Sequence, residues 1–172
     1  LGASAVTLLT LDGASSGRVT LDGTALTLSD GPFAGVIADA GSAGSLVKVS
    51  GGTLTLGGAS TYTGATMVDA GTLALVGSGS LTSTALTVAT GAALTVGVGA
   101  GLSGSTVLTM DGAVTLSPAS VTLQTLDGGA DGLMTLNGTA LTVRNGTFGG
   151  VIADGTAAGS LVKSSGGTLT LS

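Results

Sequence analysis

The residues of this sequence that could act in acid–base catalysis are its nine Asp, because the chain contains no Glu, His or Cys. Asp127 and Asp131 lie close together with Arg144 downstream, and paired carboxylates are the groups that glycoside cleavage uses. However, seven of the nine Asp directly precede Gly, including these two. Asp can bond back to its own backbone and Gly takes positive φ freely, so Asp-Gly steps are typical of turns. We interpret the acids as turn residues and predict no catalytic residue.

A bound cation or cofactor is not expected either. The segment 128–131 reads Gly-Gly-Ala-Asp and differs from the calcium-binding Gly-Gly-x-Gly-x-Asp repeat. The absence of His and Cys removes the commonest zinc ligands and every iron–sulfur cluster. The sequence therefore predicts no metal site and no cofactor site.

The remaining charged candidates are Lys48 and Lys163, with Asp39 and Asp154, each pair lying 115 residues apart. One interpretation is an ion pair between neighbouring coils or subunits. We favour the other, an exposed charge, for which a surface ion pair would contribute only about 0–1 kcal/mol.

The few aromatic residues are Tyr62, Phe33 and Phe148. Tyr62 could stack on a sugar ring, but we expect it to pack over a corner of the chain. Phe33 and Phe148 are expected in the core or at a corner.

The composition excludes two classes of partner. Four basic residues against nine acids give a net charge of −5, which leaves little to neutralise a nucleic-acid backbone. The longest hydrophobic run is Leu73–Val76, whereas a membrane-spanning helix needs about 20 apolar residues. We expect no nucleic-acid partner and no insertion of this segment into a membrane.

Short strands must position these residues. Apolar-Thr-apolar triplets recur along the chain, for example at 26–28, 54–56, 94–96 and 141–143. This period of two places Leu or Val on one face and Thr on the other. No stretch shows the 3.6-residue stripe of a helix, and Gly-rich segments separate the strands.

A long internal repeat is the strongest feature of the sequence. Residues 6–57 align without gaps on residues 121–172, with 35 identities in 52 positions. The differences fall mainly on polar and turn positions, as expected where one face is buried and the other solvated. The pair Asp127 and Asp131 is not kept, because the first copy has Asp12 and Ser16.

A shorter period indicates the architecture. A Gly precedes an alternating strand with a mean spacing of 24 residues at Gly23, Gly52, Gly71, Gly91, Gly112, Gly138 and Gly167. Periods of 20–50 residues indicate solenoids, and this one suits a coil of a three-sided parallel β-helix. We predict an all-β β-solenoid of about 7 coils, with about five coils in each 115-residue unit. A β-sandwich built on Asp-Gly hairpins does not explain either repeat.

Residues 1–172 are expected to form a single β-helix segment, with 6–57 and 121–172 as equivalent halves of successive 115-residue repeats. Stacked coils need caps or neighbours at both ends. Since Leu1 and Ser172 both lie within the repeating pattern, we expect the segment to belong to a longer repetitive chain.

Residues 44–75 carry the motifs of a known family. They contain Gly-Thr-Leu-Thr-Leu at 52–56, Thr-Tyr-Thr-Gly at 61–64 and Ala-Gly-Thr-Leu at 70–73. This string resembles the passenger-associated repeat of type V secreted autotransporters, and large filamentous adhesins are built similarly. The segments that resemble the stretch commonly preceding this repeat are Phe33–Ile37 and Phe148–Ile152.

The resemblance implies a right-handed β-helix, export across the outer membrane of a Gram-negative bacterium, and often a C-terminal translocator domain. Val47 and Ala65 depart from the pattern, since Thr and Gly would be more usual there. The lack of Cys fits export of an unfolded chain.

The predicted function is structural: a stalk or passenger segment of a secreted bacterial surface protein that serves adhesion or surface display. The alternatives are a subunit of an extracellular matrix, sheath or surface-layer filament, and a polysaccharide-active enzyme, against which the missing residues argue. Expected partners are neighbouring repeats of the same chain, other copies in a fibre or layer, and host or surface glycans.

Overall fold

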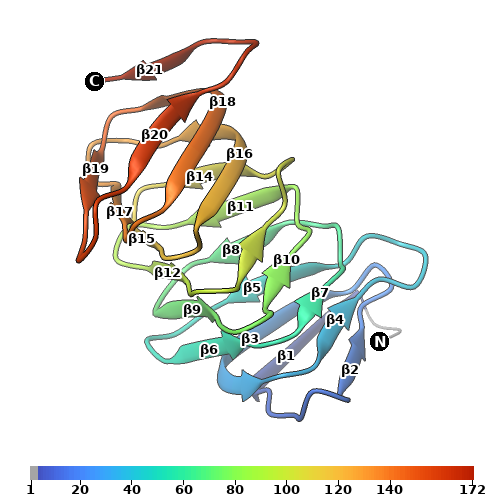
Figure 1. Ribbon diagram of the computed structural model, residues 1–172. Helices are drawn as coiled ribbons and strands as arrows, with labels where there is room; N and C mark the ends of the chain where they lie inside the picture. Colours follow the sequence, from blue (N-terminus) through green and yellow to red (C-terminus); the bar gives the residue numbers. More distant parts are fainter. Residues whose placement is uncertain (1–3) are drawn as a thin grey trace.

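The computed structural model describes residues 4–172, which form a parallel β-solenoid of about 8 turns without a helix. Every strand pair within residues 4–172 is parallel, and none of these pairs is a hairpin at an Asp-Gly step. The turns stack along one axis, with β1 (Ala5–Thr10) and β21 (Leu169–Leu171) at opposite ends (Figure 1). The predicted all-β parallel solenoid is confirmed, while its right-handedness stays a prediction. No helix that could span a membrane occurs in the described residues.

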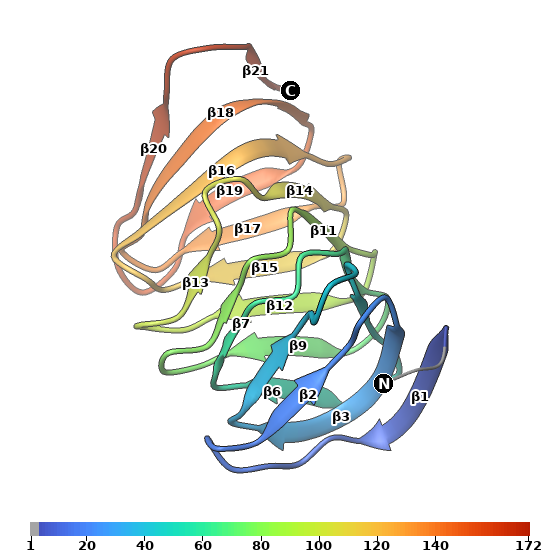
Figure 2. The ribbon, with the colours of Figure 1, turned by 90° about the vertical axis from the view of Figure 1, so that its right-hand side faces the viewer.

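The strands form three faces, and each face is a column of strands from successive turns (Figure 2). The first face contains β1, the start of β3 (Ala25–Phe33), β5 (Ser45–Lys48), β8 (Thr66–Val68), β11 (Ala85–Val88), β14 (Val107–Met110), the ends of β16 (Ser120–Asp127) and β18 (Ala140–Phe148), and β21. The second contains the end of β3, β6 (Thr53–Leu56), β9 (Thr72–Leu75), β12 (Ala93–Val96), β15 (Ala113–Leu116), β17 (Leu133–Leu136) and β19 (Val151–Asp154). The third contains β2 (Arg18–Thr20), β4 (Val36–Ala38), β7 (Ala59–Ser60), β10 (Ser80–Leu81), β13 (Gly101–Leu102), the starts of β16 and β18, and β20 (Ser160–Lys163).

The alternating pattern directs side chains as the sequence predicts. Leu26 and Leu28 of β3 are fully buried, whereas Thr27 between them is partly exposed. The core is a stack of apolar side chains in register, each at most 1% exposed: Leu54, Leu73, Leu94, Val114 and Met134 on the second face. Each such side chain contributes roughly 1.5–3 kcal/mol by burial.

The turns are shorter than the expected 24 residues. Paired residues of successive turns lie between 18 positions apart, for Val107 and Thr125, and 23 apart, for Gly146 and Leu169. The longer Gly spacings, such as that from Gly23 to Gly52, cover one turn and one further face. These longer spacings raised the mean Gly spacing above the number of residues in one turn. The chain therefore makes about 8 turns where about 7 were expected.

The 115-residue repeat does not return to the same face. The first copy's segment 25–28 lies in the first face, whose later turns contain 107–110 and 125–127. Its equivalent, 140–143, lies in the third face, between 120–123 and 160–163. The 115-residue repeat therefore spans five turns and two further faces, whereas five turns were expected. As a result, the second copy is rotated about the solenoid axis by two thirds of a turn relative to the first copy.

Asp-Gly steps serve as both turns and corners. Asp22 and Gly23 form a turn with positive φ at both residues (48° and 78°). Gly31, in contrast, lies inside β3 where this strand passes from the first face to the second, with φ of 124°. A Cβ there would lie 2.2 Å from the carbonyl oxygen of Leu11, so only Gly fits.

Candidate functional site

Of the two acids singled out by sequence, Asp127 binds the backbone of the next turn and Asp131 is exposed. The carboxylate of Asp127 accepts a hydrogen bond from the amide of Thr147 in the next turn (2.8 Å). Asp131 is exposed in the turn before β17, and Arg144 is exposed on β18. Within residues 4–172, no group of three or more acids is placed to hold a metal ion.

Asp39 joins two successive turns through its side chain. One carboxylate oxygen, Oδ1, accepts a hydrogen bond from the amide of Gly44 (2.8 Å). The other, Oδ2, accepts hydrogen bonds from both the amide and the hydroxyl of Thr63, each 2.8 Å long. Partial burial opposes ionisation of Asp39, but these three hydrogen bonds outweigh it and lower its pKa below the ordinary value.

Lys48 is fully buried, which corrects the expectation of an exposed charge. Its Nζ donates hydrogen bonds to the carbonyl oxygens of Val49 (2.8 Å), Ser50 (2.8 Å) and Ala70 (3.0 Å), the last from the next turn. Burial lowers the pKa of Lys48, and the carboxylate of Asp30 partly opposes this. The ammonium can be buried because carbonyl oxygens replace the water that would solvate it.

Tyr62 lies in the corner segment between β7 and β8, and its side chain belongs to the hydrophobic core. It is fully buried, and its hydroxyl forms a 2.6 Å hydrogen bond with the hydroxyl of Thr66, which is also buried. Burial raises the pKa of Tyr62 above its ordinary value, so the phenol is neutral. Tyr62 is therefore inaccessible to a sugar. Phe33 and Phe148 are core residues, as expected.

Lys48, Thr63 and Ala70, which make contacts between turns, lie in one segment together with buried Tyr62. Residues 46–75 match the passenger-associated-transport-repeat family. This match and the β-solenoid fold together fit an autotransporter passenger repeat protein. Comparisons with curated proteins and with solved structures gave no match.

The matched passenger-associated-transport repeat runs from β5 through β9, slightly more than one turn. Two neighbouring residues of its Thr-Tyr-Thr-Gly motif have different roles. Tyr62 fills the core, while Thr63 points to Asp39 of the preceding turn. The repeat thus contains Lys48, Thr63 and Ala70, which bond across turn boundaries, while Asp39, the partner of Thr63, precedes it.

The burial of Lys48 and the role of Asp39 were missed by sequence reasoning. For Lys48 a signal existed, because the period of two places it on the same face as Leu46, and the pairing sets it beside inward-facing Leu28. Asp39 gives no such signal, since its partner Thr63 is fixed only by the stacking of turns.

Proposed function

We propose that this chain is a structural stalk segment of a secreted passenger and holds functional regions away from the bacterial surface. The proposal rests on one observation: successive turns pair as parallel strands without interruption from β3 to β19 along the second face and from β1 to β16 along the first. Stacked at about 4.8 Å, about 8 turns extend roughly 38 Å. The family match supports a secreted or surface location.

The side-chain contacts suit a stiff segment. Apolar side chains stack through the interior, and Asp39 and Lys48 each bond across a turn boundary. Such a rod gains stability from nearest-neighbour interfaces and resists proteases because its backbone is paired.

The test is to display the chain on bacterial cells with an epitope at its outer end, beside a Gly/Ser linker of equal length. A stalk keeps the epitope accessible and survives brief protease treatment, while the linker is cut. The matched control is the double variant Leu54→Asp and Leu73→Asp, which charges two buried core positions. A wild-type chain cut as fast as the linker would contradict the stalk.

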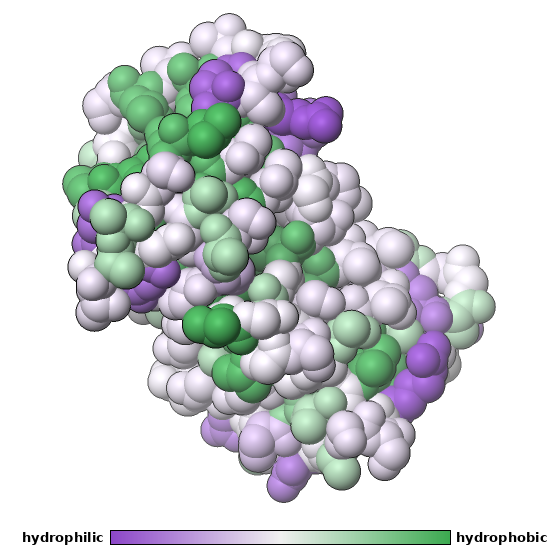
Figure 3. Space-filling view, viewed as in Figure 1, coloured by the Kyte–Doolittle hydropathy of each residue, from purple (hydrophilic) through white to green (hydrophobic). Residues whose placement is uncertain are grey.

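The second candidate is lateral assembly into a sheath, matrix or layer. One observation favours it: the outward positions of the second face carry no charge between Thr53 and Ala153, including those of β9, β12, β15 and β17. The side shown in Figure 3 is likewise mostly of intermediate hydropathy, with hydrophilic residues in small separate clusters. Two uncharged faces can approach without electrostatic repulsion.

Sedimentation velocity distinguishes these two candidates. Lateral assembly predicts larger species at high protein concentration that disappear in the double variant Thr95→Lys and Thr115→Lys. A wild-type chain that is monomeric at every concentration would contradict lateral assembly and favour a stalk made of one chain.

We further propose that the chain has no enzymatic activity. Purified chain should release no reducing ends from bacterial or host polysaccharides. Cleavage that is lost in the double variant Asp127→Asn and Asp131→Asn would contradict this.

A further inference from the structure

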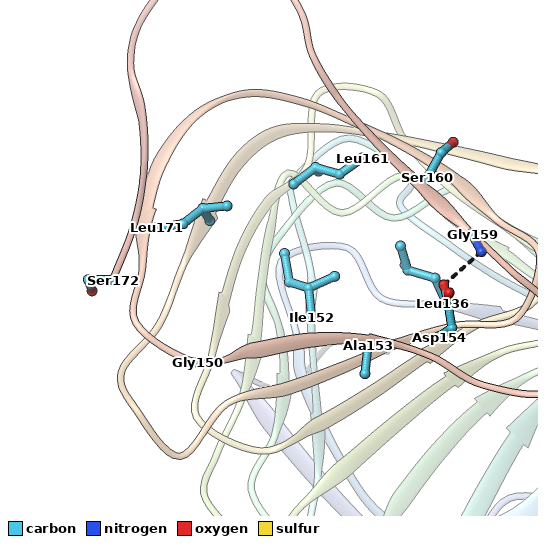
Figure 4. A pocket seen from close by; sticks show the side chains of 10 residues that line it. All are labelled: Leu136, Gly150, Ile152, Ala153, Asp154, Gly159, Ser160, Leu161, Leu171 and Ser172. Carbon is cyan, nitrogen blue, oxygen red and sulfur yellow. Dashed lines mark hydrogen bonds between the residues drawn. The ribbon is translucent and has the colours of Figure 1, made fainter.

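Two hollows of the molecular surface differ in what bounds them. One, of about 580 Å³, borders β19, β20 and β21 of the last described turn, and Ile152 and Leu171 line it (Figure 4). The other, of about 490 Å³, lies where the chain enters β12, β15 and β17, each of which pairs with a turn on both sides. This second hollow is therefore a feature of the solenoid's side, and we call it the corner groove.

The corner groove follows from the unequal lengths of three successive corners between the first and second faces. The corner after β11 has four residues, 89–92, and the corner after β16 has five, 128–132. The corner between them, after β14, has only two, Asp111 and Gly112. A Cβ on Gly112 would lie 2.3 Å from the carbonyl oxygen of Ala89, so this short corner lies directly against the preceding turn. The longer corners therefore form the walls of the groove, and the short corner forms its floor.

Small apolar side chains continue the floor along the second face. Ala93 of β12 pairs in register with Ala113 of β15, which in turn pairs with Leu133 of β17. Leu133 points outward and is 43% exposed. This surface can be covered by the aliphatic part of a side chain, because such stems pack along apolar surface while their charged ends stay in water.

Two carboxylates border the groove, and the fold uses only one of their four oxygens. Oδ1 of Asp111 accepts a 2.7 Å hydrogen bond from the amide of Gly129, which holds this carboxylate in place. The other oxygen of Asp111 and both oxygens of exposed Asp131 have no hydrogen-bond partner among residues 4–172. The residues that line the groove include no Lys or Arg, so its negative charge is not compensated from within the described chain.

This lining selects among classes of ligand. A sugar would lack an aromatic platform, because no aromatic residue lines the groove and Phe33, Tyr62 and Phe148 are all buried. A metal ion would find too few ligands, since residues 4–172 contain no group of three acids placed to hold one. The groove instead complements a ligand with an apolar stem and a cationic end.

We propose that the corner groove binds an arginine side chain presented by a partner protein. The stem of this arginine would cover Ala93 and Ala113, and its guanidinium would donate hydrogen bonds to Asp111 and Asp131. The planar fork of donors on a guanidinium matches carboxylate oxygens, whereas an ammonium is a compact point charge. The net charge of −5 favours the approach of a cationic partner. The inference does not depend on whether the chain acts as a stalk or assembles laterally.

The test titrates the chain with a capped Gly-Arg-Gly peptide and follows the backbone amides by NMR. The amides of Gly91, Gly112 and Leu133 should shift and reach saturation. The matched peptide contains citrulline in place of arginine, which keeps the stem but has a neutral end. It should bind about tenfold more weakly, because its hydrogen bonds to the carboxylates are not charge-assisted.

Two pairs of variants separate the groove from the overall charge. Asp131→Asn keeps the shape of an exposed, unbonded side chain and should weaken binding about fivefold or more. Asp69→Asn removes the same charge from the exposed corner after β8, outside the groove, and should change the affinity by less than about twofold. Ala113→Leu fills the floor without a change of charge and should abolish the saturable shifts. Thr115→Leu, at the next outward position of β15, is its control.

Three results would overturn the proposal. Equal affinity for the arginine and citrulline peptides would show that the carboxylates do not recognise the cation. Equal weakening by Asp69→Asn and Asp131→Asn would attribute binding to net charge rather than to the groove. Saturable shifts of the same amides with the neutral sugar maltotriose, and none with the arginine peptide, would assign the groove to a glycan.

Discussion

The carboxylate of Asp39 accepts both the amide and the hydroxyl hydrogen bonds of Thr63, a residue 24 positions later in the next turn. Both bonds end on one oxygen, while the other oxygen binds Gly44 within the same loop. A single side chain thus shapes its own loop and fixes the position of the loop stacked on it.

Replacing Asp39 should therefore cost more stability than replacing its equivalent in the second copy. Asp39→Ala removes three hydrogen bonds to a charged group and should lower the free energy of unfolding by about 1–3 kcal/mol. Asp154→Ala removes one and should cost under about 1 kcal/mol. Urea denaturation of both variants checks this, and equal losses would show that the contact with Thr63 contributes nothing.

The same contact predicts acid sensitivity. The pKa of Asp39 is lowered in the folded state, so the folded chain binds fewer protons at this site than the unfolded chain. The stabilisation is fully present above the unfolded value of about 4 and is lost as pH falls through the lower folded value. The stability difference between wild type and Asp39→Asn should thus shrink as pH falls from 5 to 2. A difference that is constant over this range would rule out the ionised carboxylate as its source.

Lys48→Met tests whether the buried ammonium stabilises the stack. The substitution keeps the length of the side chain but leaves the carbonyls of Val49, Ser50 and Ala70 without their donor. We expect a loss of about 1–3 kcal/mol, against under about 0.5 kcal/mol for exposed Lys163→Met. Thermal and urea unfolding measure both. If Lys48→Met were more stable than wild type, the cost of desolvating the charge would exceed the gain from its hydrogen bonds.

The sequence was sufficient for the fold class because burial follows a local rule. Alternation in segments such as 26–28 and 94–96 depends only on the period of the strand, and the buried leucines lie where it puts them. The number of residues per turn was overestimated because a Gly marks the start of a strand but does not tell which face that strand joins. The face is decided by corners such as Gly31, whose role depends on a neighbour 20 residues away, Leu11.

The side-chain contacts between turns could not be predicted from the sequence for a similar reason. Asp39 and Thr63 are 24 residues apart, and neither type nor spacing distinguishes this pair from other Asp and Thr residues. Only the stacking brings them together. Lys48 was misjudged because its charge was given more weight than its position in the alternation.

The corner at Gly31 should tolerate no side chain. In Gly31→Ala, the new Cβ would meet the carbonyl oxygen of Leu11 at 2.2 Å, and the φ of 124° is unfavourable for Ala. The backbone of the adjacent turn would have to move, so we expect a loss of about 2 kcal/mol or more. Gly51→Ala is the control, because its Cβ would have no neighbour within 4 Å and should change stability little. Circular dichroism during urea denaturation distinguishes them, and a neutral Gly31→Ala would contradict the close approach.

Two leucines at equivalent positions of the internal repeat give the final prediction. Leu56 is 1% exposed beneath β9, whereas Leu171 occupies the same position of the repeat at 52% exposure. Leu56→Ala should leave a cavity and cost about 2–5 kcal/mol. Leu171→Ala removes a side chain that is already half in water and should cost about 1 kcal/mol or less. Both are measured by urea denaturation of otherwise identical chains, so local sequence is held constant. A cost for Leu171→Ala equal to that for Leu56→Ala would contradict the difference in burial between the two leucines.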